Sequence, residues 1–379
     1  MENRLLLAFV LSLAVFVGWG YFLAEVQGPA KEPGIEELSQ DVQAVPSQQK
    51  APVSGASALP QSELSQLPTT PALVNQFPGE EVLIQVSTGK SHFVISNRGG
   101  VLKELQLPRF NNDAGEVIDL IDNPDHLTSA LALKANDPEI TAILQNALYE
   151  PSTTSIVLSQ DSPEGRLTLT LNHSSGLQVT RTYIFHFNDY QIEMDTQITA
   201  ASMASRNLQY QVLLGPGMGG KISSQTDYIV FSGATVFVNN ERKENDPDDI
   251  TGTVPYSGDL QWVAFQNKYF GSALIPQQGT KNGLVFKEKD QVFVGLEFES
   301  VQSAASAKNL FYAGTKELEI LEDKGHHLVR MIDYGWFGNK FAFLVKPLLK
   351  VLAFFYGLTQ NYGWSIIFMT CCIKLLFSP

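Results

Sequence analysis

The chain has 379 residues, of which 44% are hydrophobic, and a formal net charge of −13 at pH 7. Residues 346–379 contain three lysines and no acidic residue, so the rest of the chain carries a net charge of −16. An acidic body of this kind argues against nucleic acid or anionic lipid as its main partner, because both require a basic surface. The only cysteines are the adjacent Cys371 and Cys372, which cannot form a disulfide framework.

The first apolar segment predicts a transmembrane helix. Residues 5–24 contain no charged residue, and as a helix they span about 30 Å, the hydrocarbon thickness of a bilayer. The alternative is a cleaved signal peptide, but its apolar region is shorter and the only candidate cleavage site here contains Trp19. Arg4 precedes the run and several glutamates follow it, which places residues 1–4 in the cytoplasm and exports the body of the chain.

Residues 25–79 form the next segment, which is rich in Pro, Ser, Gln, Ala and Glu and poor in aromatic residues. It shows no sustained helical or strand periodicity. Because such a composition cannot bury enough apolar surface to fold, we expect a disordered periplasmic linker here.

Residues 80–335 alternate between apolar and polar side chains, which is typical of antiparallel strands with one face on a core. The alternation is clear at residues 167–171, 190–198 and 292–298. Turn clusters occur at Gly99–Gly100, Asn188–Asp189 and 245–249, whereas helical periodicity is confined to short pieces such as Asp137–Leu148. The sequence therefore predicts a mainly-β periplasmic domain, a β-sandwich.

This body offers no convincing catalytic or metal site. Gly215–Lys221 fits most of the phosphate-binding pattern GxxxxGK[ST], but Ile222 replaces the hydroxyl that would hold magnesium and the next residues resemble a strand. The acidic turn at 246–249 lacks the glycine and terminal glutamate of a calcium loop. The six histidines lack metal-ligand spacing; they are His92, His126, His173, His186, His326 and His327. We expect no cofactor, no metal and no catalytic residue.

Residues 336–357 predict an amphipathic helix at the membrane interface. Lys346 and Lys350 are four residues apart and therefore lie on one helical face. The opposite face is broad and apolar, with Phe341, Leu344, Val345, Leu348, Leu352 and Phe355. The pattern suits a helix lying in the interface, with an ordinary core helix as the alternative. Pro347 marks either a kink or the first turn.

Residues 360–379 form a second apolar run, which predicts the beginning of a second transmembrane helix truncated by the chain end. If Trp364 lies at the interface, Lys374 is ten residues deeper, about 15 Å along a helix and near mid-bilayer. A lysine there costs at least about 2.5 kcal/mol, so it should face water or a partner. Thr370 lies one turn earlier on the same face. The alternative is a shifted helix whose Lys374 reaches the membrane surface.

The order of these segments resembles the YidC/Oxa/Alb family of membrane-protein insertases, in particular the Gram-negative YidC form with a large periplasmic domain. The similarity is carried by the opening anchor and by Asn97–Gly100, Trp262–Phe270, Ala273–Pro276, Asp333–Phe337, Tyr362–Ile367 and Lys374–Pro379. The resemblance implies a β-supersandwich similar to sugar mutarotases. It also implies a core of five membrane helices, of which only the first begins in this chain.

The resemblance further implies a membrane protein insertase and chaperone, which inserts and folds newly made inner-membrane proteins alone or with the Sec translocon. In this family a positive residue, usually arginine, lies in a hydrophilic groove and attracts the polar or acidic part of a substrate. Lys374 occupies the matching position, and Thr370 matches a groove-facing threonine. Lysine keeps the charge but lacks the two-pronged geometry of arginine.

The partners that the resemblance implies are nascent inner-membrane proteins, the Sec translocon (SecYEG and SecDF) and membrane lipids. The ribosome would bind only through a C-terminal part absent from this sequence, so the fragment should not insert proteins by itself. We expect a multi-pass protein of the bacterial inner membrane with residues 25–360 periplasmic. The alternatives are a membrane-anchored periplasmic carbohydrate-binding or mutarotase-like protein, and an anchored periplasmic adaptor whose membrane segments are only tethers.

Overall fold

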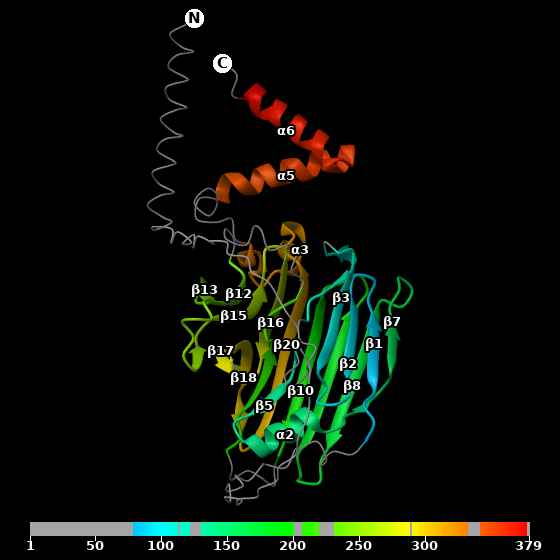
Figure 1. Cartoon of the computed structure of the whole chain (residues 1–379), viewed down its shortest axis with the longest axis vertical. Helices are drawn as coiled ribbons and strands as arrows, with labels where there is room; N and C mark the ends of the chain where they lie inside the picture. Colours follow the sequence, from blue (N-terminus) through cyan, green and yellow to red (C-terminus); the bar gives the residue numbers. More distant parts are fainter. Residues whose placement is uncertain are drawn as a thin grey trace, which may run out of the picture. The chain divides into compact units, whose positions relative to one another are not determined.

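The computed structural model describes residues 79–112, 114–121, 130–200, 207–219, 231–288, 290–332 and 342–376. The predicted helix at 5–24 and linker residues 25–78 lie outside these ranges, as do residues 333–341. Within the described ranges the chain forms three β-sheets, four α-helices and a short 3₁₀-helix (Figure 1). The predicted mainly-β domain is confirmed.

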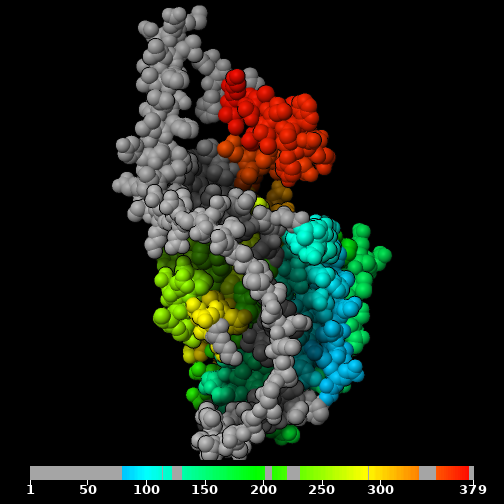
Figure 2. Space-filling model, viewed as in Figure 1, coloured from blue at the N-terminus to red at the C-terminus, as the bar shows by residue number. Residues whose placement is uncertain are grey.

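Two of the sheets have five strands each. Sheet A has the order β4-β3-β2-β1-β7. Its strands are β1 (Leu83–Ser87), β2 (His92–Ser96), β3 (Leu102–Asn111), β4 (Val117–Asp119) and β7 (Ser155–Val157). Sheet C has the order β14-β17-β18-β11-β5. Its strands are β5 (Leu133–Ala135), β11 (Tyr210–Leu214), β14 (Thr253–Tyr256), β17 (Thr280–Glu288) and β18 (Gln291–Phe298). Figure 2 shows β1 and β2 of sheet A in blue.

The third sheet, sheet B, has the order β13-β12-β15-β16-β20-β10-β9-β8-β6, with β19 paired to β20. Its strands are β6 (Glu150–Pro151), β8 (Glu164–Asn172), β9 (Gln178–His186), β10 (Gln191–Thr199), β12 (Gly233–Val238), β13 (Glu241–Asn245), β15 (Leu260–Gln266), β16 (Phe270–Gln278), β19 (Ser300–Val301) and β20 (Ala304–Thr315). Buried and accessible residues alternate along β8 and β10, which confirms the alternation predicted at 167–171 and 190–198. The alternation predicted at 292–298 is wrong, because Phe293–Phe298 of β18 are all buried.

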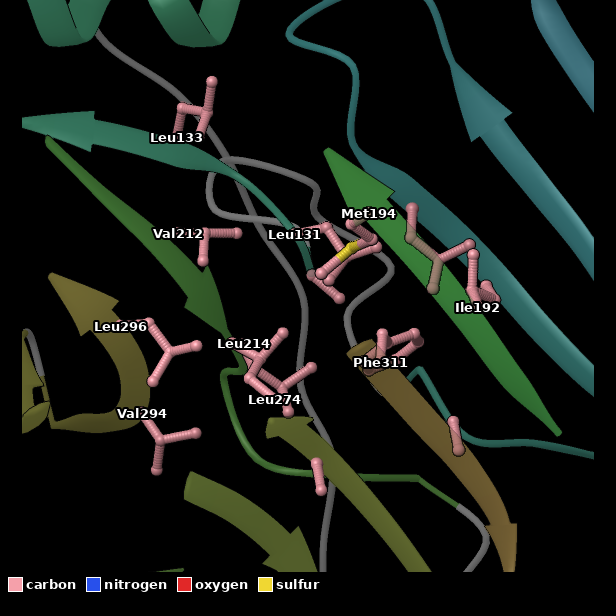
Figure 3. Packing of buried hydrophobic residues seen from close by; sticks show 14 of the residues in the cluster. Leu131, Leu133, Ile192, Met194, Val212, Leu214, Leu274, Val294, Leu296 and Phe311 are labelled. Atoms are coloured by element: carbon pink, nitrogen blue, oxygen red, sulfur yellow. The ribbon is translucent and has the colours of Figure 1, made fainter. Parts of the chain in front are cut away.

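One face of sheet B forms the core of the domain. A row of apolar side chains runs directly across its strands through Phe185, Ile192, Phe311, Leu274 and Val263. This row meets both smaller sheets. The Phe185 ring lies 5.5 Å from the Phe93 ring of sheet A, and the Val263 side chain packs over Gly283 of sheet C. Sheets A and C therefore cover the same face of sheet B as a split second layer. Figure 3 shows the core where sheets B and C meet.

The other face of sheet B is covered at one end by α3 (Leu318–Lys324) and the 3₁₀-helix η3 (Leu328–Met331). The side chains of Leu321, Leu328 and Met331 are fully buried. The His327 ring packs against Phe237 of β12 at 5.5 Å. Because both faces are covered here, β12, β15 and β16 are nearly continuous runs of buried residues and show no alternation.

Helix α2 (Pro138–Asn146) lies within the segment predicted to be helical. Asp137 is its N-cap, and its Oδ1 accepts hydrogen bonds from the backbone N–H groups of Glu139 at 2.9 Å and Ile140 at 3.2 Å. Ile140 and Leu144 bury the inner face of the helix. The cap satisfies backbone donors that no residue within the helix can reach.

We expect Asp137→Ala to lower the free energy of unfolding of the β-domain by about 1 kcal/mol, because the first turn of α2 loses its acceptor. Chemical unfolding measures this change. Asp137→Asn keeps a side-chain oxygen at the cap and should retain most of the stability. Equal losses in the two variants would contradict the capping explanation.

The described chain ends in a helical hairpin of α5 (Ala342–Thr359) and α6 (Tyr362–Leu376), joined by Gln360 and Asn361. Asn361 caps α6, since its Oδ1 accepts the Gly363 N–H at 2.8 Å. Pro347 lies inside α5 and not in its first turn. In the part of the chain that the structure describes, no helix combines the length and the apolar character needed to cross a membrane.

Candidate functional site

The helical hairpin carries both residues predicted as site residues. Its two helices touch near their connection, where the Tyr356 and Tyr362 rings stack at 4.1 Å. The Phe355 ring of α5 and the Phe368 ring of α6 also stack, with their centroids 5.8 Å apart. On the predicted apolar face of α5, Leu348, Leu352 and Phe355 are half-buried. Phe355 of that face therefore packs on α6.

Much of the remaining hairpin surface is apolar and exposed. Among its exposed apolar side chains are Leu358 at 69%, Phe354 at 64% and Trp364 at 58% of their full accessible area. The other exposed apolar residues are Leu349, Val351, Tyr362, Ile366, Ile367, Phe368 and Ile373. Exposed apolar side chains in this number mark contact with lipid or with another protein.

Thr370 and Lys374 lie on one side of α6, because residues four apart in a helix share a face. Both side chains are exposed. The Thr370 hydroxyl donates to the carbonyl oxygen of Ile366 at 2.7 Å, so its oxygen can still accept from a ligand. Lys374 forms no ion pair with any acidic residue among those described. Among the described residues, the hairpin thus presents an exposed lysine without an acidic partner.

The glycine-rich turn at Gly215–Lys221 does not form a phosphate cradle in its described part. It follows β11, but the Gly217 N–H donates to the carbonyl oxygen of Val292 at 3.3 Å, and the Gly219 N–H donates to that of Leu120 at 3.0 Å. The backbone donors that a phosphate would need are therefore used within the fold. Lys221 and Ile222 lie outside the described residues.

Four of the described histidines, His92, His173, His186 and His327, serve as local hydrogen-bonding or packing groups. His92 Nδ1 lies 3.0 Å from Ser87 Oγ, and His186 Nε2 lies 3.1 Å from Glu193 Oε1. In the acidic turn, Asp246 Oδ1 accepts the Asp248 N–H at 3.0 Å. No three His, Cys, Asp or Glu side chains of the described residues are placed to hold a metal ion. His126 lies outside these residues.

The Asn97–Gly100 segment, which contributed to the family resemblance, has a structural role. Asn97 Nδ2 donates to the carbonyl oxygen of Tyr149 at 3.1 Å. Gly99 and Gly100 have φ values of +70° and +61°, and a Cβ at Gly99 would lie 2.5 Å from the carbonyl oxygen of Gln145. Only glycine fits at this close approach.

Comparison with known families identifies the chain. Residues 83–351 match the family model of the YidC periplasmic domain, which extends from β1 into α5. The chain belongs to the YidC family. The match spans most of the chain and confirms the resemblance inferred from the sequence.

Relatives of this family cover the hairpin as well. The protein named membrane protein insertase YidC in Pelobacter propionicus is 29% identical over 394 residues, which cover 100% of this chain and 68% of that protein. The protein of the same name in Geotalea uraniireducens is 28% identical over 390 residues, which cover 100% of this chain and 69% of that protein. These names favour the YidC insertases over the carbohydrate-active alternative.

Solved structures give weaker matches. The Slr1438 protein from Synechocystis sp. PCC 6803 has a TM-score of 0.39 and 10% identity, covering 63% of this chain and 97% of that one. A galactose mutarotase related enzyme from Lactobacillus acidophilus has a TM-score of 0.39 and 7% identity, covering 62% and 97%. We draw no conclusion about function from similarities at this level.

Proposed function

We propose that this protein is an insertase and chaperone for newly made proteins of the bacterial inner membrane. The observation that carries the proposal is the match of residues 83–351 to the YidC family, together with relatives named membrane protein insertase that align over the whole chain. The reaction requires no covalent step and no cofactor. The protein lowers the cost of moving polar segments into the bilayer.

We further propose how the chain lies in the membrane. Residues 5–24 and the run at 360–379 cross the bilayer, and residues 25–360 lie on the periplasmic side. The α5 helix lies in the interface. Support comes from the exposed apolar side chains of Phe354 and Leu358 in α5, which acyl chains would cover. They lie on the same helical face as Lys350, whose Nζ lies 3.6 Å from Glu322 Oε2 of α3.

The proposed site is a hydrophilic groove that contains Thr370 and Lys374. Lys374 supplies a positive charge at membrane depth, where the low dielectric constant makes attraction of an acidic substrate segment stronger than in water. Thr370 supplies a hydroxyl oxygen one turn away. The exposure of both side chains on α6 supports this arrangement.

The proposed partners are nascent inner-membrane proteins, membrane lipids and the Sec translocon, with which the protein acts when it does not act alone. The acidic body is suited to contacts with proteins and not with nucleic acid.

Complementation tests the proposal. The protein, extended to the full length of its relatives, should restore insertion of inner-membrane proteins in bacterial cells depleted of their own insertase. The matched control replaces residues 342–376 with an unrelated apolar helical hairpin and should not restore insertion. Equal restoration by the control would favour the adaptor whose membrane segments are only tethers.

A further inference from the structure

A pair of hydroxyl groups joins the two helices of the hairpin at their connection. Thr359 Oγ1 lies 2.9 Å from Ser365 Oγ. Ser365 is fully buried, although its neighbours Trp364 and Ile366 are exposed. Each hydroxyl also has a backbone carbonyl oxygen within reach, that of Phe355 at 2.9 Å from Thr359 Oγ1 and that of Asn361 at 2.7 Å from Ser365 Oγ. Because each hydroxyl has a single proton, one of the two donates to its carbonyl oxygen and the other donates across the interface. We call the Thr359–Ser365 pair the hydroxyl contact.

The hydroxyl contact is the directional part of the interface between α5 and α6. The stacked rings of Tyr356 and Tyr362 and of Phe355 and Phe368 tolerate sliding and rotation, because dispersion attraction depends weakly on angle. A hydrogen bond weakens steeply when its geometry changes. Rotation of α6 about its own axis would therefore break the hydroxyl contact before it separated the rings.

The position of Ser365 on α6 determines where Lys374 points. The two residues are nine positions apart, which is about two and a half helical turns, so their side chains leave the helix on opposite sides. With Ser365 held against α5, Lys374 faces away from α5. We infer that the Thr359–Ser365 contact is a positioning device, which fixes the rotation of α6 and thereby turns Lys374 toward the groove. This inference rests on the groove proposed above.

Labelling of position 374 tests the inference in the full-length membrane protein. A cysteine replaces Lys374 in a background of Cys371→Ala and Cys372→Ala, and its reaction with a water-soluble maleimide is timed in native membranes. Ser365→Ala should slow labelling about threefold, the effect of losing one interhelical hydrogen bond in a membrane. Ser365→Thr keeps the hydroxyl and should restore the rate. Gly357→Ala is the matched control, because a Cβ there meets nothing within 4 Å.

Insertion is measured in parallel in protein that retains Lys374. We expect Ser365→Ala and Thr359→Val each to reduce insertion of a substrate with an acidic exported tail. The double variant should be little worse than either single variant, because both remove the same contact. Thr359→Ser should behave as the parent protein.

The results separate the inference from the proposed function. If Ser365→Ala leaves both labelling and insertion unchanged, or lowers insertion without changing labelling, the positioning role is overturned. If labelling slows while Lys374→Ala has no effect on insertion, the positioning role stands and the groove proposal fails.

Discussion

Lys374→Glu is expected to reduce insertion of a substrate with an acidic exported tail at least about tenfold, because attraction at the proposed groove becomes repulsion. Lys374→Ala removes the attraction alone and should give a smaller loss. Lys374→Arg keeps the charge and should preserve insertion. The measurement is the fraction of a pulse-labelled substrate whose tail becomes accessible to protease on the periplasmic side, in cells that depend on the full-length protein.

Two controls separate the groove charge from a general effect of charge on the hairpin. Lys350→Ala removes a lysine from α5 whose exposed side chain pairs with Glu322 of α3 at 3.6 Å, and should leave the dependence on substrate charge unchanged. A substrate with a neutral tail should be inserted equally well by the Lys374 variants. Equal insertion of the acidic substrate by the glutamate, alanine and arginine variants would refute the groove hypothesis.

The sequence predicted the strands whose outer face meets water. In β8 and β10 the sheet is covered on one side only, so apolar and polar side chains alternate along these strands. It did not predict β12, where Ala234 to Val238 are all buried. The other face of sheet B is covered at this end by α3 and η3, which follow β12 by about ninety residues in the chain. A local pattern cannot show a contact over such a distance.

In the candidate site, too, the sequence revealed a local feature but not a contact between two elements. Lys374 was visible because a charge in an apolar run is costly and therefore informative. The hydroxyl contact was not visible in the sequence, because Thr359 and Ser365 flank a helix connection, where small polar residues usually serve as caps. Its role depends on the contact between two helices, which spacing in one helix does not reveal.

Arg181 is a residue that the alternation in β9 could have singled out, because it shares the inward face with Val179, Tyr183 and Phe185. The structure places its guanidinium in the core, where Nη1 donates to the carbonyl oxygen of Gly100 at 2.8 Å. No acidic side chain of the described residues pairs with it. The guanidinium also lies over the Tyr183 ring, 5.3 Å from its centroid. A buried charge held by carbonyl oxygens and a ring is sensitive to any change of donor geometry.

The Arg181 guanidinium connects strand β9 to two separate loops. Nη2 donates to the carbonyl oxygen of Leu131 at 2.7 Å. The Tyr183 hydroxyl also donates to the carbonyl oxygen of Gly100, at 3.2 Å. Burial raises the pKa of the Tyr183 phenol, an effect that the Arg181 charge partly opposes, so the phenol stays a donor at neutral pH. Without Arg181, Gly100 would keep one donor, whereas Leu131 would lose its charged donor.

Arg181→Ala is therefore expected to lower the free energy of unfolding by about 3–5 kcal/mol, since it leaves a cavity and a buried carbonyl without its charged donor. Urea unfolding of residues 79–332 measures the loss, with the fluorescence of Trp262 as the probe. Trp262 is the only tryptophan in that range and is fully buried. Arg181→Lys should lose less, because it keeps the charge but not both directed bonds.

Thr180→Ala provides the matched control. Thr180 is adjacent on β9, but its side chain leaves the strand on the outer face and is half-buried, so its loss should change stability by less than about 0.5 kcal/mol. If Arg181→Ala lowered the free energy of unfolding as little as Thr180→Ala, the hydrogen bonds of the guanidinium would make no net contribution to stability. A large loss for Arg181→Ala with an intermediate one for Arg181→Lys would instead show that the core depends on the directed bonds to the two loops, beyond the volume of the side chain.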